Sequence, residues 1–94
     1  MKPDIVIHDT TDSVGVAVVE GIEESQELSV WIMDTNETKS IVAKDAIPLG
    51  HKIAMVDLAE GDTVIKYGYD IGKVVEATRT GHHVHVHNVK TKKW

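Results

Sequence analysis

The chain has 94 residues, a formal net charge of −5 and no cysteine. We expect residues 1–94 to form one small domain, which is too small for a deep active site of its own. The negative charge disfavours nucleic-acid binding, and the lack of cysteine excludes disulfides and thiolate metal ligands within this chain.

The residue types favour strands over helices. Fourteen valines and nine isoleucines accompany three leucines and no phenylalanine. Side chains branched at Cβ lose less freedom on a pleated sheet than in a helix. We therefore predict an all-β domain of short strands and tight turns. No apolar run approaches about 20 residues and no signal-peptide pattern begins the chain, so we expect neither membrane insertion nor export, but a cytoplasmic location.

The first half of the chain predicts two hairpins. Residues 4–8 and 13–19 read as strands around the polar turn DTTD, in which Asp12 accepts hydrogen bonds from nearby backbone groups. Residues 27–33 and 38–42 flank the turn sequence DTNE and predict a second strand pair.

Short strands are expected to continue after residue 43. Turn sequences at 48–50 and 60–61 separate apolar runs that are too short for stable helices. Gly68 is expected to adopt a backbone conformation that other residues resist. Residues 71–79 fit either a short helix or a strand, and we favour the strand. No internal repeat is visible.

The stretch 81–88, GHHVHVHN, holds four of the six histidines. If it is a strand, alternate side chains face opposite sides, about 6.5–7 Å apart along each face. The predicted site face consists of His83, His85 and His87. The predicted core face consists of His82, Val84 and Val86. Imidazoles spaced in this way can close on a metal ion or contact an anionic substrate, with the site completed by an Asp, a Glu or another chain. The alternative is an exposed strand that is merely rich in histidine.

Two further segments are candidates for a binding role. His51 and Lys52 directly follow a Pro-x-Gly turn, where a rigid loop can present them to a carboxylate; the alternative is a solvated loop end. Residues 90–94 end in Trp94, which is either part of a frayed tail or docks on a partner chain.

Four sequence patterns occur together in the second half of the chain. They read I-P-x-G-H-K-I-A, G-D-x-V-I-K-Y-G, I-G-K and H-V-H-V-H-N, and with these spacings they resemble the SAF-type domain of altronate and galactarate dehydratases and of sulfolactate sulfo-lyase. The two ends, IHDTTDSVGVAVVEGI and HVHNVKTKKW, are most similar to the free-standing small subunits that act on (2R)-3-sulfolactate. The dehydratases more often begin with D-N-V-A-V.

The resemblance implies a β-clip domain that works with a much larger catalytic subunit. It also implies removal of a proton next to a carboxylate and loss of a group from the adjacent carbon. With (2R)-3-sulfolactate the leaving group is sulfite and the product is pyruvate; with altronate, the alternative substrate, water leaves. A divalent metal, above all iron(II), is implied as the cofactor, held by this chain or mainly by the large subunit.

The family pattern falls on five residues of this chain. Their implied roles are catalysis for His83 and His85, substrate binding for His51 and Lys52, and metal ligation for His83, His85 and His87. His82 departs from the pattern, because relatives commonly carry Glu or Gly there, and it is not expected in the site.

Two other functions stay open. The chain could be a module that docks on the large subunit and orients the substrate without performing chemistry, or a free-standing metal-binding β domain. We also expect that the isolated chain can form a homo-oligomer.

Overall fold

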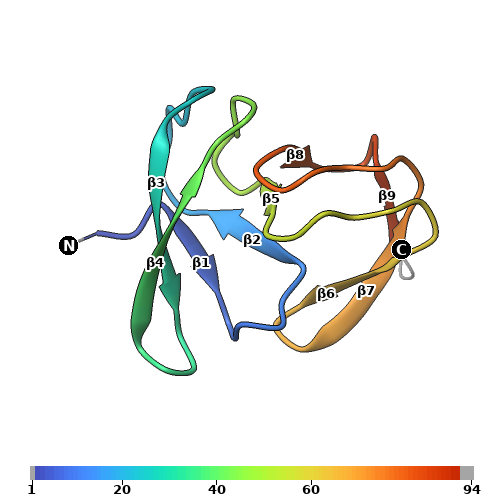
Figure 1. Cartoon of the computed structure of the whole chain (residues 1–94), viewed down its shortest axis with the longest axis horizontal. Coiled ribbons are helices and arrows are strands. Elements are labelled where there is room, and N and C mark those ends of the chain that lie inside the picture. Colours follow the sequence, from blue (N-terminus) through green and yellow to red (C-terminus); the bar gives the residue numbers. More distant parts are fainter. Residues whose placement is uncertain (1, 92–94) are drawn as a thin grey trace.

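The fold was examined in a computed structural model that describes residues 2–91 (Figure 1). These residues form nine short strands and no helix, which confirms the all-β prediction. The described residues therefore contain no helix that could span a membrane. The strands are β1 (Ile5–Ile7), β2 (Val14–Ala17), β3 (Glu27–Ile32), β4 (Glu37–Val42), β5 (Lys52–Ala54), β6 (Thr63–Lys66), β7 (Tyr69–Val74), β8 (His83–Val84) and β9 (Val89–Thr91).

The strands form two sheets. The larger sheet has the order β4-β3-β1-β2-β5-β8, and the smaller one has the order β6-β7-β9. Strands β1 and β3 run parallel, whereas the other neighbours are antiparallel. Both predicted hairpins of the first half are confirmed, since β1 pairs with β2 and β3 pairs with β4. In Figure 1 the larger sheet extends from β4 on the left to β8, and β6 and β7 lie at the lower right.

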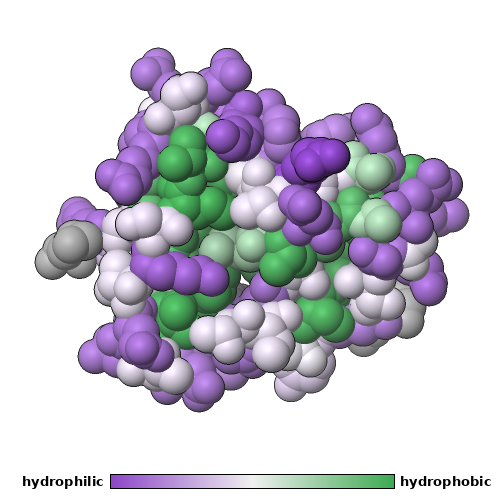
Figure 2. Space-filling view, in the orientation of Figure 1, coloured by the Kyte–Doolittle hydropathy of each residue, from purple (hydrophilic) through white to green (hydrophobic). Residues whose placement is uncertain are grey.

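Strand β5 separates two apolar clusters. Successive side chains of a strand point to opposite faces, so Ile53 packs in one cluster and Ala54 in the other. The first cluster lies on the larger sheet and includes Ile5, Leu28 and Val30. The second joins the two sheets and consists of Val14, Ala54, Leu58, Val64, Val74, Val84 and Val89. Apolar residues also show through the middle of the face in Figure 2, inside a hydrophilic rim. Lys52 and Val84 therefore lie where β5 and β8 cover the second cluster.

A short element recurs four times in the fold, although the sequence shows no repeat. Each copy starts with a residue in an isolated backbone bridge, and the residue three positions later has a positive φ. The copies are Ile22 with Ser25, Ile47 with Gly50, Leu58 with Gly61, and Thr78 with Gly81. The first copy bridges to the second and the third to the fourth. We call these four segments the bridge–turn elements. The repeat is not visible in the sequence, because the four segments have a similar backbone path but few residue types in common.

Asp12 ties two turns together. Its side chain is 2% exposed and accepts hydrogen bonds from the backbone nitrogens of His8 at 2.8 Å and Gly68 at 3.0 Å. Gly68 has a φ of 76°, which confirms the expected special conformation. Asp12 is thus the predicted backbone acceptor, and it also connects the β1–β2 turn to the β6–β7 turn.

The strand predicted over residues 71–79 is wrong in its second half. Strand β7 ends at Val74, because the chain then bends so that Thr78 can bridge to Leu58. Val75, directly after the strand, is 47% exposed. Residues 92–94, with the predicted docking residue Trp94, lie outside the described residues.

Candidate functional site

The histidine stretch begins as a strand at the edge of the larger sheet. Strand β8 contains only His83 and Val84, which lie opposite Ile53 and Lys52 of β5. This pairing places the histidine stretch directly beside the GHK loop, although more than thirty positions separate them in the sequence. The two segments that the sequence singled out are therefore neighbours in space.

The strand predicted over residues 82–88 is wrong beyond Val84. Residues 85–88 form a turn in which the backbone nitrogen of Asn88 donates to the carbonyl oxygen of His85 at 3.2 Å. The Asn88 side chain also accepts a hydrogen bond from the His85 nitrogen and so replaces a strand partner. As a consequence Val84 is buried, whereas Val86, which we expected in the core, is 69% exposed.

Three imidazoles form a stacked cluster. The ring of His51 lies 3.8 Å from that of His85 and 5.0 Å from that of His83, between centroids, with interplanar angles of 9° and 16°. The rings of His83 and His85 are 5.9 Å apart. Nδ1 of His51 and Nε2 of His83 are 2.8 Å apart and share a hydrogen bond. We call these three residues the imidazole cluster.

The imidazole cluster brings three possible metal ligands together. One nitrogen from each ring lies within 4.8 Å of the other two. Imidazole nitrogens bind zinc at about 2.0–2.1 Å along a lone pair in the ring plane, so the stacked rings must turn out of their parallel arrangement to bind one ion together. His87 is exposed, and its ring lies 5.2 Å from that of His83 at an angle of 40°, outside this group. The geometry therefore favours His51, in place of the predicted His87, as the third possible metal ligand.

The surroundings keep two members of the imidazole cluster neutral. Burial, followed by the neighbouring imidazoles of His51, His87 and His85, lowers the pKa of His83. Burial, then His51 and the ammonium of Lys52, lowers the pKa of His85. Since a metal ion binds the neutral imidazole, both shifts favour ligation at neutral pH.

Lys52 has no carboxylate partner among residues 2–91. Its pKa is lowered by burial and then by the nearby charge of Lys66. No ion pair in the described part of the chain involves Lys52. A half-buried ammonium next to a second positive charge favours the arrival of an anion, which agrees with the expected contact to a substrate carboxylate or sulfonate.

Asp45 was not predicted, yet it contacts the histidine stretch twice. Its Oδ2 accepts hydrogen bonds from Nδ1 of His82 and from the backbone nitrogen of His83, both at 2.9 Å. The bond from His83 is the main reason why the pKa of Asp45 is lowered. His82 is half-buried and turns toward Asp45. The predicted packing of His82 with the valines of the core face is therefore wrong. The sequence carries no signal for this contact, because Asp45 lies in a loop 37 residues away.

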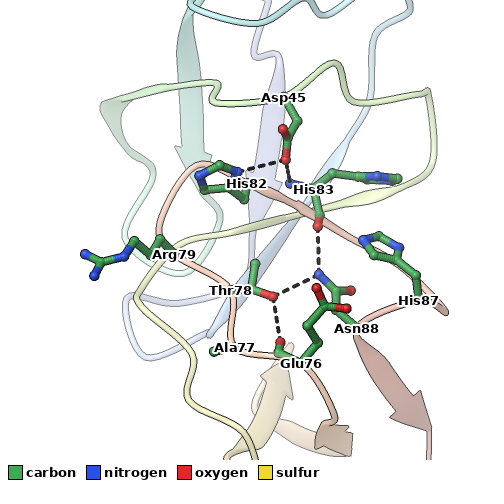
Figure 3. Close-up of a pocket in the computed structure, with 9 residues that line it drawn as sticks. All are labelled: Asp45, Glu76, Ala77, Thr78, Arg79, His82, His83, His87 and Asn88. Carbon is green, nitrogen blue, oxygen red and sulfur yellow. Dashed lines mark hydrogen bonds and ion pairs between the residues drawn. The ribbon is translucent and has the colours of Figure 1, made fainter.

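Two hollows flank the imidazole cluster. The larger one, with a volume of about 250 Å³, is polar and includes His83 in its lining (Figure 3). Its lining residues are Asp45, Glu76, Ala77, Thr78, Arg79, His82, His83, His87 and Asn88. A smaller hollow of about 70 Å³ is lined by Lys52 and His85 together with mainly apolar residues. A small anionic molecule can therefore approach the imidazole cluster from a polar side or from the side of Lys52.

Comparisons with known proteins identify the family of this chain. The profile described as the altronate/galactarate dehydratase SAF domain matches residues 3–92. A protein of Chromohalobacter salexigens named (2R)-sulfolactate sulfo-lyase subunit alpha is 60% identical over 94 residues, all of both chains. A protein of Paracoccus pantotrophus with the same name is 51% identical over 63 residues, 67% of this chain and 94% of that one. Altronate dehydratase of Bacillus subtilis is 48% identical over 52 residues, 55% of this chain and 10% of that enzyme.

Proposed function

The chain belongs to the altronate/galactarate dehydratase SAF domain family, and from this membership we propose that it is the small subunit of a lyase that eliminates sulfite from (2R)-3-sulfolactate. The observation that carries the proposal is the 60% identity, over all of both chains, to a protein named (2R)-sulfolactate sulfo-lyase subunit alpha. The imidazole cluster and the unpaired Lys52 provide matching chemistry. We further propose that residues 1–94 form one SAF domain of the β-clip type.

The proposed reaction is a β-elimination. A base removes the proton from C2 of sulfolactate, and the electron pair left behind forms a double bond between C2 and C3. The bond between C3 and sulfur breaks, and sulfite leaves with the bonding electrons. The resulting enol takes up a proton at C3 and becomes pyruvate. The difficult requirement is stabilisation of the negative charge that develops on the carboxylate next to C2.

A divalent metal fits the imidazole cluster. We propose that His51, His83 and His85 hold it, with iron(II) as the preferred ion and with further ligands from the large subunit. When bound, such an ion supplies positive charge that stabilises an enediolate. His51 Nδ1 and His83 Nε2 share a proton, so ligation through these two nitrogens would require its loss.

The side chains of this chain bind and orient the substrate. Lys52 receives the carboxylate or the sulfonate, since no carboxylate of the described chain neutralises it. We propose that His83 and His85 are catalytic, because they combine neutral imidazoles with a place between the two hollows. We also keep the proposal that His51 contacts the substrate, beside its place in the imidazole cluster.

The large subunit is the proposed partner that completes the site. Three ligands on the surface of a small domain leave an open face, which another chain can close over the substrate. The name subunit alpha of the two relatives implies such a partner for those proteins. We propose that the assembly is cytoplasmic, and cell fractionation tests this location. We also propose that the isolated chain can form a homo-oligomer, which size-exclusion chromatography tests.

An activity assay of the assembled pair tests the proposal. The chain is purified with and without its large subunit, and the release of sulfite from (2R)-3-sulfolactate is measured. We expect activity only for the pair. A pair that fails on sulfolactate but removes water from altronate contradicts the proposed substrate and supports a dehydratase, the alternative that the 48% identity over 52 residues favours.

A further inference from the structure

The side chain of Asn88 is buried in the middle of the histidine stretch. Only 3% of its surface is exposed. Its Oδ1 accepts a hydrogen bond from the backbone nitrogen of His85 at 2.8 Å. Its Nδ2 donates to the carbonyl oxygen of His83 and to Oγ1 of Thr78, both at 2.9 Å (Figure 3). Both hydrogens of the amide are therefore used, one on the backbone carbonyl oxygen of His83 and the other on the hydroxyl of Thr78.

These bonds replace a strand partner for the histidine stretch. Strand β8 ends at Val84, so the groups beyond it receive no further pairing from β5. The Asn88 carboxamide binds the carbonyl oxygen of His83 and the nitrogen of His85, which lie on either side of Val84. One planar group thus links two backbone positions whose imidazole rings lie 5.9 Å apart.

The contact with Thr78 breaks the pattern of the bridge–turn elements. The first residue of the other three copies is a buried aliphatic residue: Ile22, Ile47 and Leu58. Thr78 is equally buried, at 8% exposure, and it accepts from Asn88 while its hydroxyl donates to the carbonyl oxygen of Glu76. An aliphatic residue in its place would leave a buried amide hydrogen of Asn88 without a partner, which is costly. The fourth element is therefore adapted to hold this asparagine.

We propose that Asn88 is a positioning residue, whose carboxamide holds the backbone of His83 and His85 so that their rings meet His51. Asn88 acts through the backbone of these histidines, because the polar atoms of its carboxamide are bonded within the chain. The metal-binding role of the imidazole cluster, and so the benefit of positioning it, rests on the proposed function. The placement of the His83 ring beside His51 does not depend on a metal, since the hydrogen bond between these two rings is present without one.

Substitution of Asn88 tests this role with two measurements on the full chain. The first is calorimetric titration with Co²⁺ alone, and the second is nitrogen NMR of the histidine side chains to detect the hydrogen bond between His51 and His83. We expect Asn88→Ala to weaken Co²⁺ binding by about 10- to 100-fold, as loss of an outer support of a metal site does. The NMR signature of the shared proton should disappear as well.

A control separates positioning from stability. Val64→Ala removes volume from the apolar cluster that also contains Val84, so it lowers the melting temperature without a change in the hydrogen bonds of the histidines. We expect this variant to keep its affinity for Co²⁺ and the NMR signature. If circular dichroism shows that Asn88→Ala is unfolded, Asn88→Asp takes its place, because its ionised form still accepts from His85 but cannot donate to His83.

The outcomes distinguish this inference from the proposed function. A folded Asn88 variant that keeps both the Co²⁺ affinity and the shared proton overturns the positioning role. A wild-type chain that takes up no Co²⁺ contradicts the metal site, and the NMR comparison then decides alone. Loss of the shared proton in the Asn88 variant but not in Val64→Ala supports the positioning role in either case.

Discussion

The members of the imidazole cluster come from two distant segments, and their roles differ from those suggested by sequence spacing. His51 contributes a nitrogen 2.8 Å from that of His83, whereas His87 is exposed and lies outside the group of ligand atoms. A group of three imidazoles therefore forms although the histidine stretch itself supplies only two of them.

Single substitutions distinguish the two ligand sets. We expect His51→Ala to weaken the binding of Co²⁺ by at least about tenfold, because even loss of outer partners of a ligand costs about 10- to 100-fold. His87→Ala should leave the affinity nearly unchanged. Isothermal titration calorimetry measures both variants. If His87→Ala weakens binding as strongly as His51→Ala, the ligand set predicted from the sequence regains support.

The lowered pKa values of His83 and His85 make stability depend on pH. Burial is the first cause of both shifts, so the folded chain favours the neutral rings. The unfolded chain takes up protons near pH 6.5, the ordinary value for histidine, whereas the folded chain does so only at lower pH. This contribution to stability is complete above about pH 6.5 and is lost as the pH falls through the lowered values.

Denaturant unfolding at pH 7.5 and pH 5.0 measures this dependence. We expect the wild type to lose more unfolding free energy between the two conditions than the variant with both His83→Gln and His85→Gln. Carboxylates with lowered pKa values, such as Asp45, titrate at lower pH and are present in both proteins, so the comparison isolates the two histidines. An equal loss in the two proteins would show that their burial does not oppose protonation.

At the scale of elements, the bridge–turn elements connect the fold to the site. Gly81 ends the fourth copy and starts the histidine stretch, and its carbonyl oxygen accepts from the nitrogen of Lys44. Its φ is 90°, and an added Cβ would lie 2.5 Å from the carbonyl oxygen of Val42. Gly61 ends the third copy with a φ of 91°, but nothing lies within 4 Å of an added Cβ.

These two glycines form a matched pair for mutation. We expect Gly61→Ala to lower the unfolding free energy by about 1–2 kcal/mol, the strain of a positive φ in a residue with a Cβ. Gly81→Ala should cost clearly more, because the same strain is joined by a backbone clash, and it should also weaken Co²⁺ binding. Denaturant unfolding and calorimetry measure the two effects. Equal losses of stability would show that the backbone near Val42 yields without cost.

The sequence predicted those elements that are determined locally. The two hairpins of the first half follow from polar turns between apolar runs, and the Pro48–Gly50 turn follows from its residue types. The turn at residues 85–88 was missed because alternating His and Val read as a strand. What decides it is the carboxamide of Asn88 and its contact with Thr78, ten positions away. Asp45 was missed for the same reason, since its contacts span 37 and 38 positions.

At the scale of the whole molecule, the proposed site lies at one edge of the domain. The imidazole cluster, Lys52 and both hollows lie around β5 and β8. In Figure 1 β8 lies at the upper edge of the molecule, away from the β3–β4 hairpin. The proposed large subunit would cover this edge, with the apolar cluster that contains Val84 behind it.

Kinetics of the assembled pair decide whether this half performs chemistry or only binds. If His83 and His85 act on the reacting atoms, His83→Ala and His85→Ala should lower kcat for sulfite release by at least about 100-fold, the lower range for loss of an acid–base or electrostatic contribution. Lys52→Met removes an anion contact and should mainly raise KM. If instead both histidine variants raise KM and keep kcat, the chain is a module that orients the substrate for catalysis by the large subunit. Co-purification with the large subunit must be checked for each variant, because loss of assembly would lower activity without a change in chemistry.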